Sequence, residues 1–288
     1  MDYLMHLIVI MSIFAILGLS LNLVIGYTGL LSLAHAAFFG IGAYTFAIMV
    51  KDYNLPFFIA IFASIFVGAL ISVLVGVVFS RFSGDYYALA TLGFTSICYS
   101  AFLNLVDITG GPFGISGVPK PEIFGFVFST GERYTVFIIV ITALIALICF
   151  YITRSSFGRV LKSIREDAEV VSVFGYRVEH YRLVIFAISA GIASVAGGLY
   201  ASYISYIGPS SFSDMTSIYC VLIIIIGGLS SHKGSLIGAI IYIFLPEILR
   251  FLGLPDAVAG YLRQMIFGVC IVALMMYKPK GIFGNYRL

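Results

Sequence analysis

Charged residues are scarce in this sequence, and tryptophan is missing altogether. Only 10 % of the 288 residues are Asp, Glu, Lys or Arg, whereas a soluble surface carries about 25–35 %. This shortage excludes an ordinary soluble domain, and the hydrophobic content of 61 % with a mean hydropathy of +1.11 predicts an integral membrane protein. Without tryptophan, the aromatic belts at the membrane interfaces fall to the nineteen tyrosines, many of which lie where apolar runs end.

Motifs for catalysis are also missing. The chain contains no GxxxxGK[ST] phosphate loop and no Gly-Lys pair, so it lacks the usual device for binding and hydrolysing ATP. It has no HExxH, CxxC or GxSxG motif, and its four cysteines stand in or beside different apolar runs without paired spacing. We therefore expect no enzyme activity, no metal site, no disulfide framework and no cofactor in this chain.

Apolar runs longer than ten residues, without polar alternation, predict membrane-spanning helices instead of barrel strands. The fold expected is an all-α, polytopic bundle of about eight to ten transmembrane helices. Two runs are candidates for broken or re-entrant helices: the glycine-rich stretch 26–42 and the short run 217–229. The nine predicted spans are Leu4–Ile25, Leu30–Val50, Pro56–Phe79, Tyr87–Val106, Tyr134–Ile152, Leu183–Tyr203, Ser217–Leu229, Leu236–Leu252 and Tyr261–Tyr277.

The polar segment Arg154–Arg182 interrupts this pattern, with six of the sixteen basic residues and four of the thirteen acidic ones. Basic residues collect on the cytoplasmic side of membrane proteins, so this segment and the basic tail after Tyr277 are predicted to face the cytoplasm. One amphipathic helix is expected, ended by Gly175, either lying on lipid or docking into another protein. Six bases against four acids favour docking. Its apolar positions recur at steps of three and four: Phe157, Leu161, Ile164, Ala168, Val171 and Phe174.

Polar side chains within the apolar runs are costly in lipid unless they are paired or face water, so each is a candidate for a translocation pathway. The alternative is that they only bond a neighbouring helix or a backbone carbonyl. The candidates are Asn22, His35, Thr91, Thr95, Asn104 and Asp107.

Small residues four positions apart, Ala190, Ser194 and Gly198, predict close packing of the helix that follows the polar segment. His232 and Lys233 lie at the tip of a glycine-punctuated turn, where we expect solvated loop residues. The alternative is that they contact the same cytoplasmic partner as the central helix.

Several blocks, in order along nearly the whole chain, resemble the permease subunits of branched-chain amino acid ABC importers, and among these the LivM-type subunits. The blocks are LNLVIGYTGLLSLAHAAFFGIGAY, DYYALATLGFTSI with TGGPFGISGVP, FGRVLKSIREDAEVVSVFGYRVEHYRLVIFAISAGIASVAGGLYA, GPSSFS, IGGLSSHKGSLIGA, LPEILR and KPKGIFG. The paired HK in GGLSSHKGS departs from the apolar or aromatic residue common nearby in relatives.

The resemblance implies that residues 1–288 form one permease domain in the bacterial inner (plasma) membrane, with a cytoplasmic coupling loop at about 154–182. It implies a heterodimer with a paralogous permease subunit, two cytoplasmic ATPase subunits that bind ATP and Mg, and an extracytoplasmic substrate-binding protein. The cargo would be branched-chain or related small amino acids. The residues expected to meet the ATPases are Arg159, Lys162, Arg165, Glu166, Asp167, Glu169, Phe174 and Gly175.

Two alternatives stay open from the sequence. Importers of short amides and of urea share the family, and these motifs do not separate their substrates from leucine, isoleucine and valine. The chain would otherwise be a self-contained channel or secondary carrier for a small polar solute, although few carboxylates lie within its spans.

Overall fold

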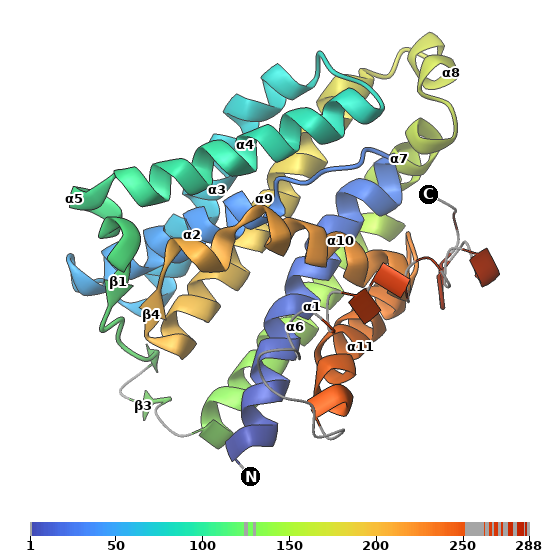
Figure 1. The fold of residues 1–288 in the computed structure, drawn as a ribbon. Helices are drawn as coiled ribbons and strands as arrows, with labels where there is room; N and C mark the ends of the chain where they lie inside the picture. Colours follow the sequence, from blue (N-terminus) through green and yellow to red (C-terminus); the bar gives the residue numbers. More distant parts are fainter. Residues whose placement is uncertain are drawn as a thin grey trace.

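The computed structural model describes residues 2–123, 126–128 and 131–250, with scattered positions between 262 and 286, and it is almost entirely helical (Figure 1). Short 3₁₀ turns η1 (Gly111–Phe113) and η2 (Pro209–Phe212) and strands β1 (Ile115–Ser116), β2 (Glu122–Ile123), β3 (Phe126–Val127) and β4 (Tyr206–Ile207) lie in the connections. The helices are α1 (Asp2–Thr28), α2 (His35–Lys51), α3 (Phe57–Phe79), α4 (Asp85–Asn104), α5 (Val106–Thr109), α6 (Gly131–Arg154), α7 (Ser156–Glu166), α8 (Ala168–Val173), α9 (Val178–Ile204), α10 (Asp214–Gly227) and α11 (His232–Arg250).

Five described helices, α1, α3, α4, α6 and α9, are long and apolar enough to cross a membrane. They coincide with five of the predicted spans, so the helical membrane bundle is confirmed. The helix pair α10 and α11 is bent by 119° and counts as a broken span, and α2 is a shorter apolar helix preceded by the non-helical link 29–34. Both segments predicted to be broken are therefore interrupted, whereas the predicted span Tyr261–Tyr277 falls largely outside the described residues.

The core of the bundle consists of α1, α2 and α9, with α3 packed along α9. Ala190, Ser194 and Gly198 on α9 are all buried. A side chain at Gly42 of α2 would collide with the backbone of Ser194, so the two helices approach more closely than any larger residue would allow. The Ser194 hydroxyl lies within hydrogen-bond distance of the carbonyls of Ala190 (2.9 Å) and Phe38 (3.2 Å), so its one O–H has an acceptor inside this contact.

The outer helices α3 and α6 turn large apolar side chains away from this core. Phe62, Phe66, Val136 and Val140 are mostly exposed. In a bilayer, lipid tails or a second subunit would cover such surfaces, because they have no polar groups to offer water. The bundle therefore has a densely packed centre and an apolar outside.

The prediction of a single helix over 157–175 is wrong, because the polar segment forms two helices. The segment forms α7 and α8, with Asp167 between them in an extended conformation (φ −157°, ψ 103°). The Asp167 carboxylate accepts the backbone N–H groups of Glu169 and Val170, both at 3.0 Å, so it caps a new helix instead of continuing the old one. The second helix ends just before Gly175, where φ is +87°, in agreement with the predicted stop.

Candidate functional site: the α7 end of the bundle

Helix α7 lies against the bundle through one apolar face. Leu161 and Ile164 are buried, and α7 packs on α1, α6 and α9. Its first turn is capped by the Ser155 hydroxyl, which accepts the N–H of Gly158 at 3.3 Å. In Figure 1, α1 runs from the N-terminal end of the molecule up to α7, so the two helices meet where α1 ends.

Arg165 binds the end of α1. Its guanidinium donates to the carbonyl of Ile25 at 2.9 Å and to that of Gly26. The last four carbonyls of a helix have no partner within it and carry the negative end of its dipole, so a cation stabilises them. Partial burial lowers the pKa of Arg165, while Tyr286 and Glu166 act in the opposite direction. An arginine pKa starts so high that the group stays charged at neutral pH.

A second set of contacts joins α7, α1, α6 and the turn between α10 and α11. The Lys162 ammonium lies 5.5 Å from the centre of the Tyr27 ring. Tyr27 donates to the carbonyl of Ser230 at 3.3 Å and stacks on His232, whose Nε2 is 2.8 Å from the Thr153 hydroxyl. We call Tyr27, Thr153, Lys162, Arg165 and His232 the helix junction. The prediction that His232 is a solvated loop residue is wrong, because it is half-buried here, whereas Lys233 is exposed.

The C-terminal tail closes over the same end. The N–H of Ile282 donates to the carbonyl of Ile226 at 3.1 Å, and that of Phe283 to the carbonyl of Gly227 at 2.9 Å. These bonds cap the last carbonyls of α10. Further along, the ring of Tyr286 lies 4.3 Å from the Arg165 guanidinium carbon. The tail thus links the end of α10 to α7.

The outward side of α7 and α8 forms an open groove of about 640 Å³. Apolar side chains are exposed here beside charged ones: Phe174, which lines the groove, is 77 % exposed and Val170 is half-exposed, and Val173, next to Phe174 in the sequence, is 85 % exposed. Of the residues predicted to meet an ATPase, Arg159, Glu166, Asp167 and Phe174 line this groove, and Glu169 and Gly175 are exposed beside it. Lys162 and Arg165 instead face the helix junction. Periodicity did not single out Val170 or Tyr176, which also line this groove.

Asn22 is fully buried at the junction between α1 and the α10–α11 turn. Its amide nitrogen donates to the Ser231 carbonyl (3.0 Å) and the Ser235 hydroxyl (2.8 Å), and its oxygen accepts the N–H of Ser230 at 2.9 Å. Both N–H groups of the side-chain amide therefore hold the bent helix pair against α1. This geometry corresponds to the alternative in which a polar side chain only bonds a neighbouring helix.

His35, Thr91 and Thr95 come together around the non-helical link 29–34. Thr91 accepts the N–H of Leu33 at 2.9 Å, and Thr95 donates to the Leu33 carbonyl at 2.7 Å. His35 Nε2 is 2.9 Å from the hydroxyl of Ser189, which itself donates to the Ser20 carbonyl. Since that hydroxyl has one hydrogen, Nε2 must donate to it, which leaves Nδ1 unprotonated and, within the described part of the chain, without a hydrogen-bond partner.

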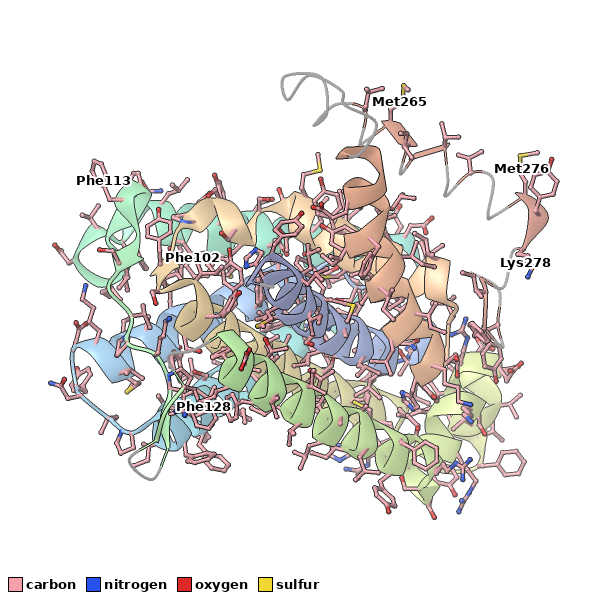
Figure 2. The ribbon with its side chains drawn as sticks, turned by 90° about the horizontal axis from the view of Figure 1, so that it is seen from below. Phe102, Phe113, Phe128, Met265, Met276 and Lys278 are labelled. Atoms are coloured by element: carbon pink, nitrogen blue, oxygen red, sulfur yellow. The ribbon has the colours of Figure 1, made fainter. Side chains whose placement is uncertain are left out.

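Asn104 and Asp107 lie far from the other pathway candidates, where α4 and α5 end, and both are exposed. The Asn104 amide donates to the Ser100 carbonyl at 2.7 Å. The six candidates thus occupy three separate places: the contact between α1 and the α10–α11 turn, the link before α2, and the α5 end, where Figure 2 shows Phe113 pointing outward.

Asp214 was not among the predicted pathway candidates, because it follows an irregular Gly-Pro-Ser loop and not an apolar run. It begins α10 beside the middle of α4, where the Ser96 hydroxyl donates to its Oδ2 at 2.9 Å. Its Oδ1 is buried and has no hydrogen-bond partner among the described residues. An acid at this depth in a membrane bundle joins the pathway candidates by default.

A bundle of long apolar helices with one polar segment, α7 and α8, on its surface defines a multi-pass helical membrane protein. The chain belongs to the family of branched-chain amino acid transport system permease components, whose model matches residues 3–275. It is 31 % identical to the high-affinity branched-chain amino acid transport system permease protein LivM of Salmonella typhimurium, over 96 % of this chain and 68 % of the relative.

Two further relatives fit this family. LivM of Escherichia coli K12 is 31 % identical over the same shares of both chains, and the permease protein LivH of Salmonella typhimurium is 23 % identical over 95 % of this chain and 92 % of the relative. No solved structure matches the chain significantly.

Proposed function

We propose that this chain is the permease subunit of an ATP-driven importer in the bacterial inner membrane, and that it carries branched-chain or related small amino acids. Its partners would be a paralogous permease subunit, two cytoplasmic ATPase subunits that bind ATP and Mg, and an extracytoplasmic substrate-binding protein. The family membership and the names of the relatives support an amino acid permease of a multi-subunit transport system.

The observation that carries the coupling to ATPases is the groove on α7 and α8. The six-residue helix α8 buries only Val171 and exposes Val170 and Val173, and Phe174, which follows it, is exposed as well, so this segment gains little from its own bundle. Apolar side chains of this size are each worth about 1.5–3 kcal/mol when removed from water, so a partner that covers them gains affinity there. Acidic and basic groups at the rim, among them Arg159 and Glu166, would fix the orientation of that partner.

Reconstitution tests the energy source. The chain is placed in vesicles with its partner permease, the ATPases and the binding protein, and uptake of labelled leucine is measured with ATP, without ATP and with an ATPase that cannot hydrolyse it. We expect uptake only with active ATPase. Uptake at full rate without the ATPase subunits would establish the channel or carrier alternative instead.

Co-purification tests the docking surface. Phe174→Glu places a charge in the groove and is expected to abolish recovery of the ATPase subunits with this chain. Phe113→Glu is the matched control, because Phe113 is an equally exposed phenylalanine (87 %) at the opposite end of the molecule (Figure 2). Equal loss in both variants would show that the effect is general and not due to the groove.

A further inference from the structure

Arg165 stands on the opposite side of α7 from the groove. The α7 residues that line the groove include Arg159, Ser163 and Glu166, and Arg165 is not one of them. Its guanidinium reaches 140 positions back along the chain, to the last turn of α1. A partner that grips the groove would therefore pull on α7 from one side, while Arg165 holds α1 from the other.

Helix α1 is well placed to pass on such a pull. It is one of the most buried long helices, and it packs along α6, α9, α10 and α11. At the end held by Arg165, its Asn22 and Tyr27 side chains bind the turn of the broken pair α10–α11. A displacement of the end of α1 would therefore act directly on that pair.

The chemistry of the contact fits arginine in particular. The guanidinium is a planar fork that can donate to two neighbouring carbonyls and stack on a ring at the same time, as it does with Ile25, Gly26 and Tyr286. Gly29, with φ at +74°, turns the chain away directly beside it, and a Cβ there would lie 3.3 Å from the Arg165 Cγ. A lysine would keep the charge but would lose the fork and most of the stacking.

We propose that Arg165 is a positioning residue that couples the docking segment to the membrane bundle by fixing α7 to the end of α1, with Tyr286 holding the guanidinium in place. This inference rests on the proposed function, because coupling requires an ATPase on the groove. It assigns Arg165 to the transmission of movement and not to contact with the ATPase, the role suggested by the resemblance.

The experiment compares Arg165→Ala, Arg165→Lys and Arg154→Ala in the complete reconstituted complex. Arg154 is the matched control, because its guanidinium also lies over a ring, that of Phe150 at 4.2 Å, but on its own helix. ATPase recovery, ATP hydrolysis and amino acid uptake are measured on the same vesicles. For Arg165→Ala we expect normal recovery and hydrolysis but a drop in uptake per ATP on the order of tenfold, within the usual range of coupling between two sites.

Arg165→Lys is expected to lie between Arg165→Ala and the unchanged chain, and Arg154→Ala to match the unchanged chain. An unaltered ratio of uptake to hydrolysis in Arg165→Ala would overturn the proposal, as would loss of ATPase recovery in that variant alone. If Arg165→Ala does not assemble, Tyr286→Leu provides the same test by loosening the guanidinium while leaving its bonds to α1, and it should also lower uptake per ATP.

Hydrogen exchange on the isolated chain tests the contact without any partner. Arg165→Ala should accelerate exchange at the end of α1 and in the link 29–34, and Arg154→Ala should not. If this holds while no ATPase binds the unchanged chain, the proposed function fails and the contact stands. Unchanged exchange at the end of α1 would remove the physical basis of the inference.

Discussion

Helices α7 and α8 are neighbours in one polar segment, yet they serve the molecule differently. Helix α7 buries Leu161 and Ile164 and binds α1 through Arg165. Helix α8 buries Val171 and leaves Val173 largely exposed, and Phe174, directly after its end, is exposed too. The capped break at Asp167 thus separates a helix that the bundle holds through its buried face from a shorter helix that buries only one side chain.

The largest expected effect is a difference in how much substitutions in α7 and in α8 lower the free energy of unfolding. Leu161→Ala should lower the free energy of unfolding by about 2–5 kcal/mol, because it leaves a cavity between α7 and the bundle. Val173→Ala, on the exposed side of α8, should change it by less than about 0.5 kcal/mol. Thermal unfolding of the purified chain in detergent measures both, and similar losses in the two variants would erase the distinction between the helices.

The next effect concerns the affinity of the chain for the ATPase subunits. Phe174→Ala should weaken ATPase binding by about 2 kcal/mol, typical of an aromatic residue at the centre of an interface. Its unfolding temperature should stay the same. A titration of the ATPase subunits onto the chain gives the affinity, and the comparison would break if unfolding shifted while affinity did not.

A smaller effect concerns the break itself. Asp167→Ala removes the side chain that caps α8 and should cost about 1 kcal/mol, whereas Asp167→Asn keeps a capping oxygen and should cost less. Hydrogen exchange at the amides of Glu169 and Val170, which now donate to the carboxylate, reports the loss directly. Equal protection in the alanine and asparagine variants would mean that packing, and not the cap, sets the break.

The smallest effect sharpens the account of α7. Lys162→Met keeps the long side chain but removes the charge over the Tyr27 ring, and should cost about 0.5–1 kcal/mol. Thermal unfolding is again the measurement. A loss as large as that of Leu161→Ala would show that Lys162 holds α7 in place as firmly as the buried face does.

The sequence made the membrane class and the buried face of α7 predictable, because apolar run length and a three-to-four spacing are local properties. The spacing of apolar residues did not predict the break at Asp167, since Ala168 and Val171 continue the three-to-four spacing across it. The signal available was Asp167 itself, a residue type that favours the start of a helix. The spacing of apolar residues identifies the buried face of a helix but does not show where the helix axis changes direction.

Contacts between distant segments were beyond the sequence reading. The sequence placed Arg165 among the residues expected to meet the ATPases, while its backbone acceptors, Ile25 and Gly26, leave no trace in composition. His232 stood at the tip of a glycine-rich turn, and only the fold brings it against Thr153. The helix junction therefore had to be read from the structure.

Uptake per ATP hydrolysed, measured in one vesicle preparation for Arg165→Ala and for Phe174→Ala, tests the division between the two helices most directly. The account predicts that Phe174→Ala lowers uptake and hydrolysis together, so that their ratio is kept, whereas Arg165→Ala lowers the ratio. The same ratio in both variants would contradict it.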